Sequence, residues 1–197
     1  NMIPRFYDAS AGEVLIGGRD VKSFEIPELR ERIGIVPQKA VLFKGSIRDN
    51  MRWGKDDATD DEILAAAKTA QAADVIESKG GLDFEIEQGG KNLSGGQRQR
   101  FTIARALVRK PEILILDDSA SALDFATDAA LRKSIREMDT NPTVFIVSQR
   151  TSSIQHADKI IVLDDGKIAG IGKHDELLNS CPVYSEIYNS QFKKEAV

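Results

Sequence analysis

LSGGQRQRFTIARALVRKPEILILDD, the stretch from Leu93 to Asp118, decides the fold. It opens with a serine and two glycines, at a point where a loop is expected to turn into a helix. Apolar residues then recur on one broad face until Lys110-Pro111, as they do in an amphipathic helix. The apolar run Ile113–Leu116 follows and ends on Asp117 and Asp118, which predicts a buried strand with two carboxylates at its carboxyl end.

Helices and strands alternate on both sides of this stretch. Before it, the sequence predicts a hairpin around Gly17-Gly18, a strand over Ile33–Pro37 and an alanine-rich helix behind the capping box Thr59–Glu62. The later predicted elements are a helix over Phe125–Met138, strands over Thr143–Ser148 and Ile160–Leu163, and a helical tail from Asp175. This alternation predicts an α/β fold, and short apolar strands suit a parallel sheet covered on both faces.

The composition is that of a soluble domain with a sizeable core. Of 197 residues, 41% are hydrophobic and 29% are charged, with 27 basic against 31 acidic side chains. A net acidic chain lacks the basic face that neutralises phosphates, so no nucleic-acid partner is expected. The single cysteine, Cys181, favours a reducing compartment, and no apolar run approaches the ~20 residues that span a bilayer.

The segment Leu93–Gln97 can bind an anion. The hydroxyl of Ser94 and the backbone N–H groups of Gly95 and Gly96 would face outward at the positive end of the helix dipole. Glycines there let the backbone approach phosphate oxygens without a Cβ in the way. Taken alone, these residues are better explained as a serine N-cap with glycines in a turn.

The two aspartates stand where α/β sheets place their ligands. Asp117 can hold Mg²⁺ there, usually through water, and Asp118 lies within reach of the same place. The segment Ser121–Asp124 follows as a turn that caps the next helix. Taken alone, adjacent aspartates after a strand are more often only a strand-ending turn.

Over nearly its whole length the chain resembles the ATP-binding cassette family. The resemblance is carried by Gln38 after a strand, the signature Leu93–Gln97, the strand Ile113–Asp118, the turn Ser121–Asp124 and the segment Ser148–Arg150. The order and spacing make it specific, because the signature precedes the acidic strand by about twenty residues and Gln149 follows that strand by about thirty.

This resemblance implies a P-loop NTPase-like α/β core with a mostly parallel sheet and a small antiparallel hairpin region. It also implies one partial nucleotide-binding domain over residues 1–197, with an α-helical signature subdomain at about residues 46–110 inside it.

ATP and Mg²⁺ are the implied cofactors, and the family's motifs give roles to five residues. Gln38 would sense the γ-phosphate and join the metal site, and Asp117 would organise Mg²⁺ and water. Asp118 would be the general base and Gln149 would occupy the switch position, so both are catalytic candidates. Asp124 would contact the partner across the dimer.

Family members work as head-to-tail pairs, so the signature serves the partner's nucleotide. The resemblance therefore implies that Ser94, Gly95, Gly96 and Gln97 bind ATP held by a second nucleotide-binding domain. In exporters the region Gln38–Asn50 touches the membrane domain.

Two positions depart from the family pattern. Asp118 stands where most members carry glutamate, which withdraws the carboxylate by ~1.3 Å, whereas a base must lie within ~2.6–3.2 Å of the proton it takes or act through water. Gln149 replaces the switch histidine, and an amide can bond a phosphate but cannot relay a proton. With the signature intact, this pattern resembles the degenerate-site half of a heterodimeric exporter.

The family's phosphate-binding loop, G-x-x-x-x-G-K-[ST], does not occur in the sequence, and Asn1–Asp8 resembles the segment that follows it. We expect this chain alone to bind ATP very weakly and to have little or no ATPase activity. The parent protein would be an ATPase that couples hydrolysis to export. Its transmembrane domain would lie upstream on the same polypeptide and this domain at the cytoplasmic face of the membrane.

Two alternatives stay open. The first is a soluble cassette ATPase that acts on DNA or ribosomes, although the residues between Gln38 and Leu93 leave no room for the long coiled coil of the DNA-associated type. The second is a regulatory cassette that binds nucleotide without hydrolysing it.

Overall fold

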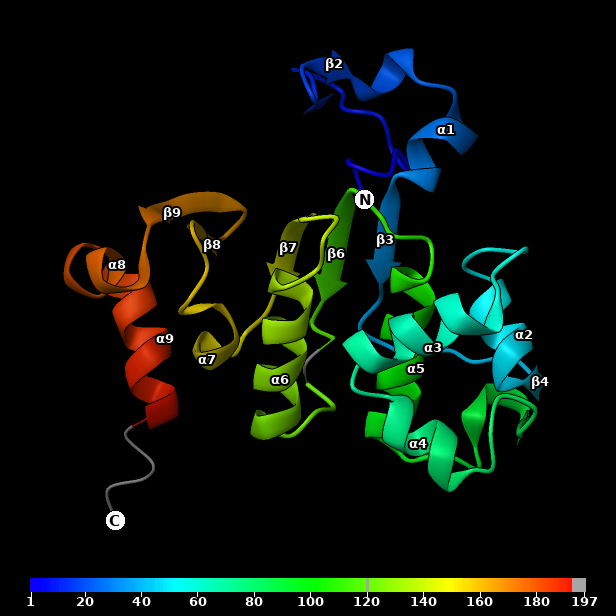
Figure 1. Cartoon of the computed structure of the whole chain (residues 1–197). Helices are drawn as coiled ribbons and strands as arrows, with labels where there is room; N and C mark the ends of the chain where they lie inside the picture. Colours follow the sequence, from blue (N-terminus) through cyan, green and yellow to red (C-terminus); the bar gives the residue numbers. More distant parts are fainter. Residues whose placement is uncertain (120, 193–197) are drawn as a thin grey trace. The chain divides into compact units, whose positions relative to one another are not determined.

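A computed structural model describes residues 1–119 and 121–192. The chain divides into two compact units, one running from Asn1 to Phe145 and the other beginning at Ile146. Each unit is described by itself, and Figure 1 labels most of their elements.

The first unit contains most of the secondary structure. Its elements are β1 (Leu15–Ile16), β2 (Arg19–Asp20), η1 (Val21–Ser23), α1 (Ile26–Glu31), β3 (Ile33–Val36), β4 (Gly45–Ser46), α2 (Ile47–Arg52), α3 (Asp60–Thr69), α4 (Ala73–Ser78), β5 (Glu85–Ile86), η2 (Gln88–Gly90), α5 (Gly95–Leu107), β6 (Ile113–Asp117) and α6 (Phe125–Arg136). Strand β7 (Thr143–Val147) crosses the boundary between the units. The second unit contains α7 (Thr151–Ile154), β8 (Ile160–Asp164), β9 (Lys167–Gly172), α8 (His174–Ser180) and α9 (Pro182–Phe192).

A three-stranded sheet with the order β3-β6-β7 positions the site. Strands β3 and β6 are parallel, with Ile33 opposite Ile113 and Val36 opposite Leu116. Parallel strands need a crossover connection, and α2 to α5 supply it. Because the two strands run in register, their carboxyl ends reach the same edge of the sheet.

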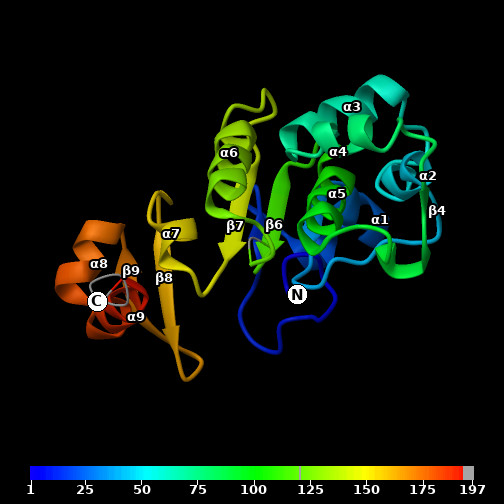
Figure 2. The ribbon, with the colours of Figure 1, turned by 90° about the horizontal axis from the view of Figure 1, so that it is seen from below.

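The crossover forms a helical lobe centred on α5. Helix α5 contacts α2, α3 and β3, and both views show α3 beside it (Figures 1 and 2). Its side chains Phe101 and Ile103 are fully buried. Three helices of the lobe begin with capping boxes, at Ser46, Thr59 and Ser94, each of which satisfies otherwise free backbone N–H groups.

Two smaller clusters hold the rest of the described chain together. Val21 and Phe24, which follow the hairpin β1-β2, and Leu29 of α1 pack on the sheet, and Ile16 of the hairpin packs against them. In the second unit, one face of the hairpin β8-β9 is covered by Leu177 and Tyr184 from α8 and α9.

The predicted fold class is confirmed: an ABC-type α/β core with a parallel strand pair and small antiparallel hairpins. The expected covering of both faces does not extend to β7, where Val144, Phe145 and Val147 remain exposed. The helical tail is interrupted at Cys181, since Pro182 begins a new helix. A single domain with a subdomain at residues 46–110 stays a prediction.

Candidate functional site

Gln38 and Asp118 meet at the carboxyl edge of the sheet. Each follows the last paired residue of its strand by two positions, so the register of Val36 with Leu116 brings both to the same edge. The side-chain amide of Gln38 donates to Oδ2 of Asp118 at 3.1 Å. The structure therefore joins two predicted site residues that the sequence separates by 80 positions.

The backbone of Asp118 is left-handed, with φ of 45°. Non-glycine residues seldom adopt this conformation, and aspartate is among those that tolerate it best. Its carbonyl oxygen accepts bonds from the backbone N–H of Ser121 at 3.2 Å and from the Ser121 hydroxyl at 2.8 Å. These bonds fix the turn that aims the Asp118 carboxylate toward Gln38.

The donors at this edge suit Mg²⁺. Asp117 ends β6 with an exposed side chain, and the Gln38 amide oxygen and the Asp118 carboxylate lie at the same edge. Magnesium prefers oxygen ligands and commonly takes only one or two carboxylates, the rest coming from water and phosphate. Among residues 1–119 and 121–192 no cluster of three His, Cys, Asp or Glu side chains forms a closed metal cage.

The signature lies at the exposed start of α5. Ser94 is the N-cap: its Oγ accepts from the Gln97 backbone N–H at 3.2 Å, and the Gln97 side chain accepts from the Ser94 N–H at 2.9 Å. Ser94 and Gly95 are exposed, so another molecule can reach the serine hydroxyl and the glycine backbone. The cap and the anion site are thus compatible uses of the same residues.

The signature abuts the turn that contains Asp124. A Cβ on Gly96 would lie 3.2 Å from the carbonyl oxygen of Ala122, so a side chain there would push that carbonyl away by a few tenths of an ångström. Asp124 caps α6 by accepting from the backbone N–H of Thr127 at 2.9 Å and from its hydroxyl at 2.8 Å. These bonds hold the pKa of Asp124 below its usual value, and the bond from the Thr127 backbone N–H has the larger effect.

Gln149 belongs to the second unit, where its side chain is exposed. Its backbone carbonyl accepts from the Gln191 side chain at 2.6 Å, which ties the segment after β7 to α9. Its switch role stays a prediction.

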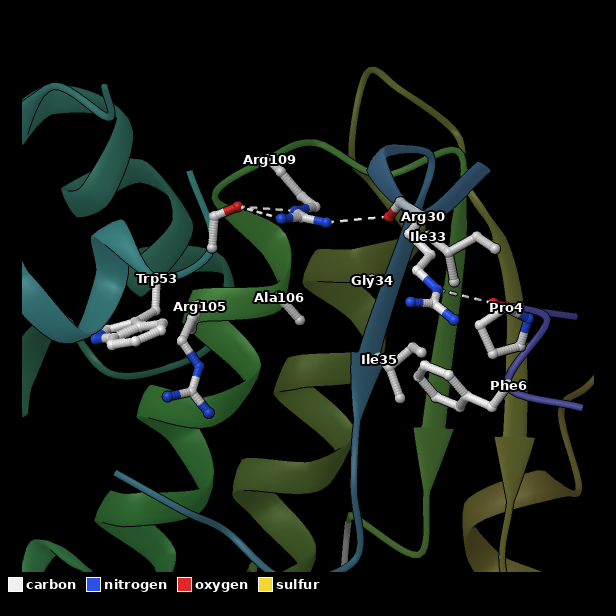
Figure 3. A pocket seen from close by; sticks show the side chains of 11 residues that line it. Pro4, Phe6, Arg30, Ile33, Gly34, Ile35, Trp53, Arg105, Ala106 and Arg109 are labelled. Carbon is white, nitrogen blue, oxygen red and sulfur yellow. Dashed lines mark hydrogen bonds between the residues drawn. The ribbon is translucent and has the colours of Figure 1, made fainter. Parts of the chain in front are cut away.

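The sequence reading missed a set of arginines on one side of the lobe. Arg109 donates to the carbonyl of Gly54 at 2.8 and 2.6 Å and to the carbonyl of Arg30 at 3.0 Å. Figure 3 shows these bonds, with Trp53 and Arg105 side by side at the same cavity of about 240 Å³. The apolar periodicity of this stretch does not single out Arg105 within α5 or Arg109, which lies two residues beyond its end.

Known proteins match the chain closely. The family described as ABC transporter matches residues 1–121. An uncharacterized ABC transporter ATP-binding protein of Mycobacterium tuberculosis is 44% identical over 97% of this chain and 33% of its own length. A Staphylococcus aureus protein, provisionally named a multidrug export ATP-binding/permease protein, is 41% identical over 97% of this chain and 33% of its own length.

A solved structure agrees with them. The structure of a bacterial Atm1-family ABC exporter with ATP bound matches 97% of this chain and 34% of that chain, with a TM-score of 0.92 and 40% identity. The chain thus spans about a third of the length of the relatives it matches. Within the part that the structure describes, no helix is both long and apolar enough to cross a membrane. The chain belongs to the ABC transporter family and is an ATP-binding domain of the exporter type.

Proposed function

We propose that this domain binds ATP and, paired with a second ATP-binding domain, drives export through a membrane domain on the same polypeptide. The proposal is supported by the similarity to an ATP-bound exporter, of which the chain covers 34%. The location would be the cytoplasmic face of the membrane, where such a domain has access to ATP.

The exposed start of α5 is the observation that supports pairing with a second ATP-binding domain. Ser94 and Gly95 present a hydroxyl and a backbone N–H to solvent at the positive end of a 13-residue helix. A triphosphate bound to a second domain supplies the negative charge that this end favours. The residues Ser94, Gly95, Gly96 and Gln97 would therefore complete the partner's site.

The chain's own site is proposed to be the slower one of a heterodimer. Mg²⁺, when bound, supplies the positive charge that neutralises the phosphates, and Asp117 would hold it with the amide oxygen of Gln38. Asp118 would accept a proton from the attacking water, but its carboxylate is one methylene short and already bonded to Gln38. Gln149 would bond the γ-phosphate without being able to move a proton.

The test uses the full-length transporter pair. The double substitution Asp118→Glu and Gln149→His is expected to add turnover at the second site, since general-base catalysis is worth about 10²- to 10⁴-fold. Both sites are filled with ATP, and single-turnover hydrolysis then measures how many of the two sites hydrolyse it. Unchanged single-site hydrolysis counts against the degenerate assignment, and no hydrolysis by the wild-type pair favours a regulatory cassette.

A further inference from the structure

One side chain of the last helix holds residues 148–151, which we call the switch segment. Gln191 lies in the last turn of α9, and its amide oxygen accepts from the backbone N–H and from the hydroxyl of Thr151, each at 3.0 Å. Its amide nitrogen donates to the backbone carbonyl of Gln149 at 2.6 Å. A single amide thus joins two residues that lie 40 and 42 positions before it, all within the second unit.

The bonds to Thr151 replace a helix cap that the adjacent sequence does not supply. Thr151 is buried and begins α7, a helix of four residues. Arg150, at the N-cap position, makes no side-chain hydrogen bond to the start of this helix. The first N–H groups of a helix have no partner inside it, and a buried donor without a partner is costly. Because Gln191 accepts from the Thr151 N–H, α7 depends on α9 for its cap.

The backbone around Gln149 is fixed while its side chain is exposed. The N–H of Arg150 donates to the Ser148 hydroxyl at 2.9 Å, which closes a turn around Gln149, and Gln191 holds the Gln149 carbonyl. The side chain of Gln149 faces solvent. A backbone fixed in advance reduces the entropy that is lost when the side chain binds a ligand. The arrangement therefore suits a residue that contacts a ligand with its side chain.

Helix α9 is anchored firmly enough to act as the support. Tyr184 of this helix is buried in the cluster that covers one face of the β8-β9 hairpin. Its hydroxyl also shares a hydrogen bond of 2.8 Å with Nδ1 of His174. Tyr184 and Gln191 are separated by about two helical turns, so they lie on the same face of α9. The face that anchors the helix is thus the face that presents Gln191 to the switch segment.

We propose that Gln191 is a positioning residue for Gln149, through which α9 controls how well this chain's own site distinguishes ATP from ADP. The inference rests on the proposed function, in which the Gln149 side chain bonds the γ-phosphate. ADP lacks that phosphate, so a displaced switch segment weakens binding of ATP and leaves binding of ADP unchanged. Gln191 itself contacts no nucleotide in this account and acts only through the backbone of Gln149.

The experiment measures nucleotide binding by the full-length transporter pair. Its two sites are titrated by calorimetry with a non-hydrolysable ATP analogue and, separately, with ADP, each with Mg²⁺. Gln191→Ala should weaken binding of the ATP analogue at one of the two sites by about tenfold, the lower end of what a hydrogen bond to a charged group contributes. Binding of ADP should change by less than about twofold. Asn189→Ala, at an exposed position of the same helix, is the control and should match the wild type.

A second variant separates the cap of α7 from the hold on Gln149. Gln191→Glu keeps an acceptor for Thr151 but replaces the donor that faces the Gln149 carbonyl by a carboxylate oxygen. It should therefore lose affinity for the ATP analogue as Gln191→Ala does, and it decides the matter if Gln191→Ala fails to fold. If Gln191 acts through Gln149, adding Gln191→Ala to Gln149→Ala should cause no further loss.

The outcomes distinguish this inference from the proposed function. Equal losses for the ATP analogue and ADP, additive losses in the double variant, or unchanged binding of the ATP analogue in Gln191→Glu overturns the role of Gln191 and leaves the proposed function standing. Wild-type binding of both nucleotides by Gln149→Ala refutes the γ-phosphate contact itself, and the inference falls with it.

Discussion

The Gln38 amide and the Asp118 carboxylate share a hydrogen bond of 3.1 Å at one end of a parallel strand pair. The bond joins a residue expected to sense nucleotide to the residue expected to act as base. Any ligand that draws Gln38 away frees one oxygen of Asp118, so the two groups are expected to respond together when nucleotide arrives.

The left-handed backbone at Asp118 predicts which substitutions the turn accepts. Asp118→Asn should leave the free energy of unfolding unchanged within about 0.5 kcal/mol, because asparagine also tolerates positive φ. Asp118→Val should lower it by about 1–2 kcal/mol, because a β-branched residue clashes in this conformation. Urea denaturation of this chain measures both, and equal stabilities would show that the turn is not constrained.

The capping box at Ser94 predicts a stability cost that is separate from nucleotide binding. Ser94→Ala should destabilise this chain by about 1 kcal/mol, and Ser94→Asp should restore the loss because aspartate is an equally good cap. Thr59→Ala is the matched control, since Thr59 begins the capping box of α3 and should show a similar loss. No change in the urea midpoint of Ser94→Ala would mean that the cap contributes nothing.

The close approach of Gly54, which follows α2, to α5 predicts that this position cannot accept a side chain without displacing its neighbours. A Cβ there would collide with the backbone carbonyl of Arg105. Gly54→Ala should therefore cost about 1–3 kcal/mol through displaced backbone. Gly95→Ala is the control: its Cβ would lie 3.9 Å from the nearest atom, Nη2 of Arg98, so little loss is expected in the same thermal melts. Equal melting temperatures for the two variants would contradict the close packing of Gly54 against the backbone of Arg105.

The cap at Asp124 predicts a dependence on pH. Its folded-state pKa is depressed by bonds from Thr127, so the stabilisation is present above the unfolded pKa, about 3.9, and is lost as pH falls through the folded value. Wild type should thus lose stability relative to Asp124→Asn below about pH 4, because the amide caps without titrating. Chemical denaturation at pH 6 and pH 3 measures the free energy of unfolding of wild type and Asp124→Asn. An equal loss in both proteins would exclude the Asp124 carboxylate as the source of the pH dependence.

The sequence predicts the elements of this domain better than their contacts. Apolar runs and capping boxes located β3, α3, α5 and β6, because local chemistry determines where such elements begin and end. The bond between Gln38 and Asp118 needs the register of two strands that a whole helical lobe separates, which no local pattern specifies. The two-residue strands β4 and β5 pair from distant parts of the sequence and are not predicted, whereas β1 and β2, equally short, are predicted from the glycine turn between them.

The sequence predicts candidate site residues where a motif coincides with an element boundary. Ser94 and Asp117 are of this kind, since one begins a helix and the other ends a strand. No local pattern predicts the left-handed turn at Asp118, because it depends on packing around the residue. Only the resemblance to the ATP-binding cassette family points to Gln149 as a site residue, and its role remains a prediction.

Steady-state ATP hydrolysis by the full-length transporter pair tests the central claim most directly, with Ser94→Arg compared with Asp118→Asn. If the signature of this chain completes the productive site of the partner, Ser94→Arg should lower turnover by about a hundredfold or more, a loss typical when groups that stabilise transition-state charge are removed. Asp118→Asn should lower it by less than about twofold, because its own site contributes little. Thr59→Arg, which also replaces the cap of a lobe helix, should stay near wild type. Strong inactivation by Asp118→Asn with near-normal turnover in Ser94→Arg would contradict the account.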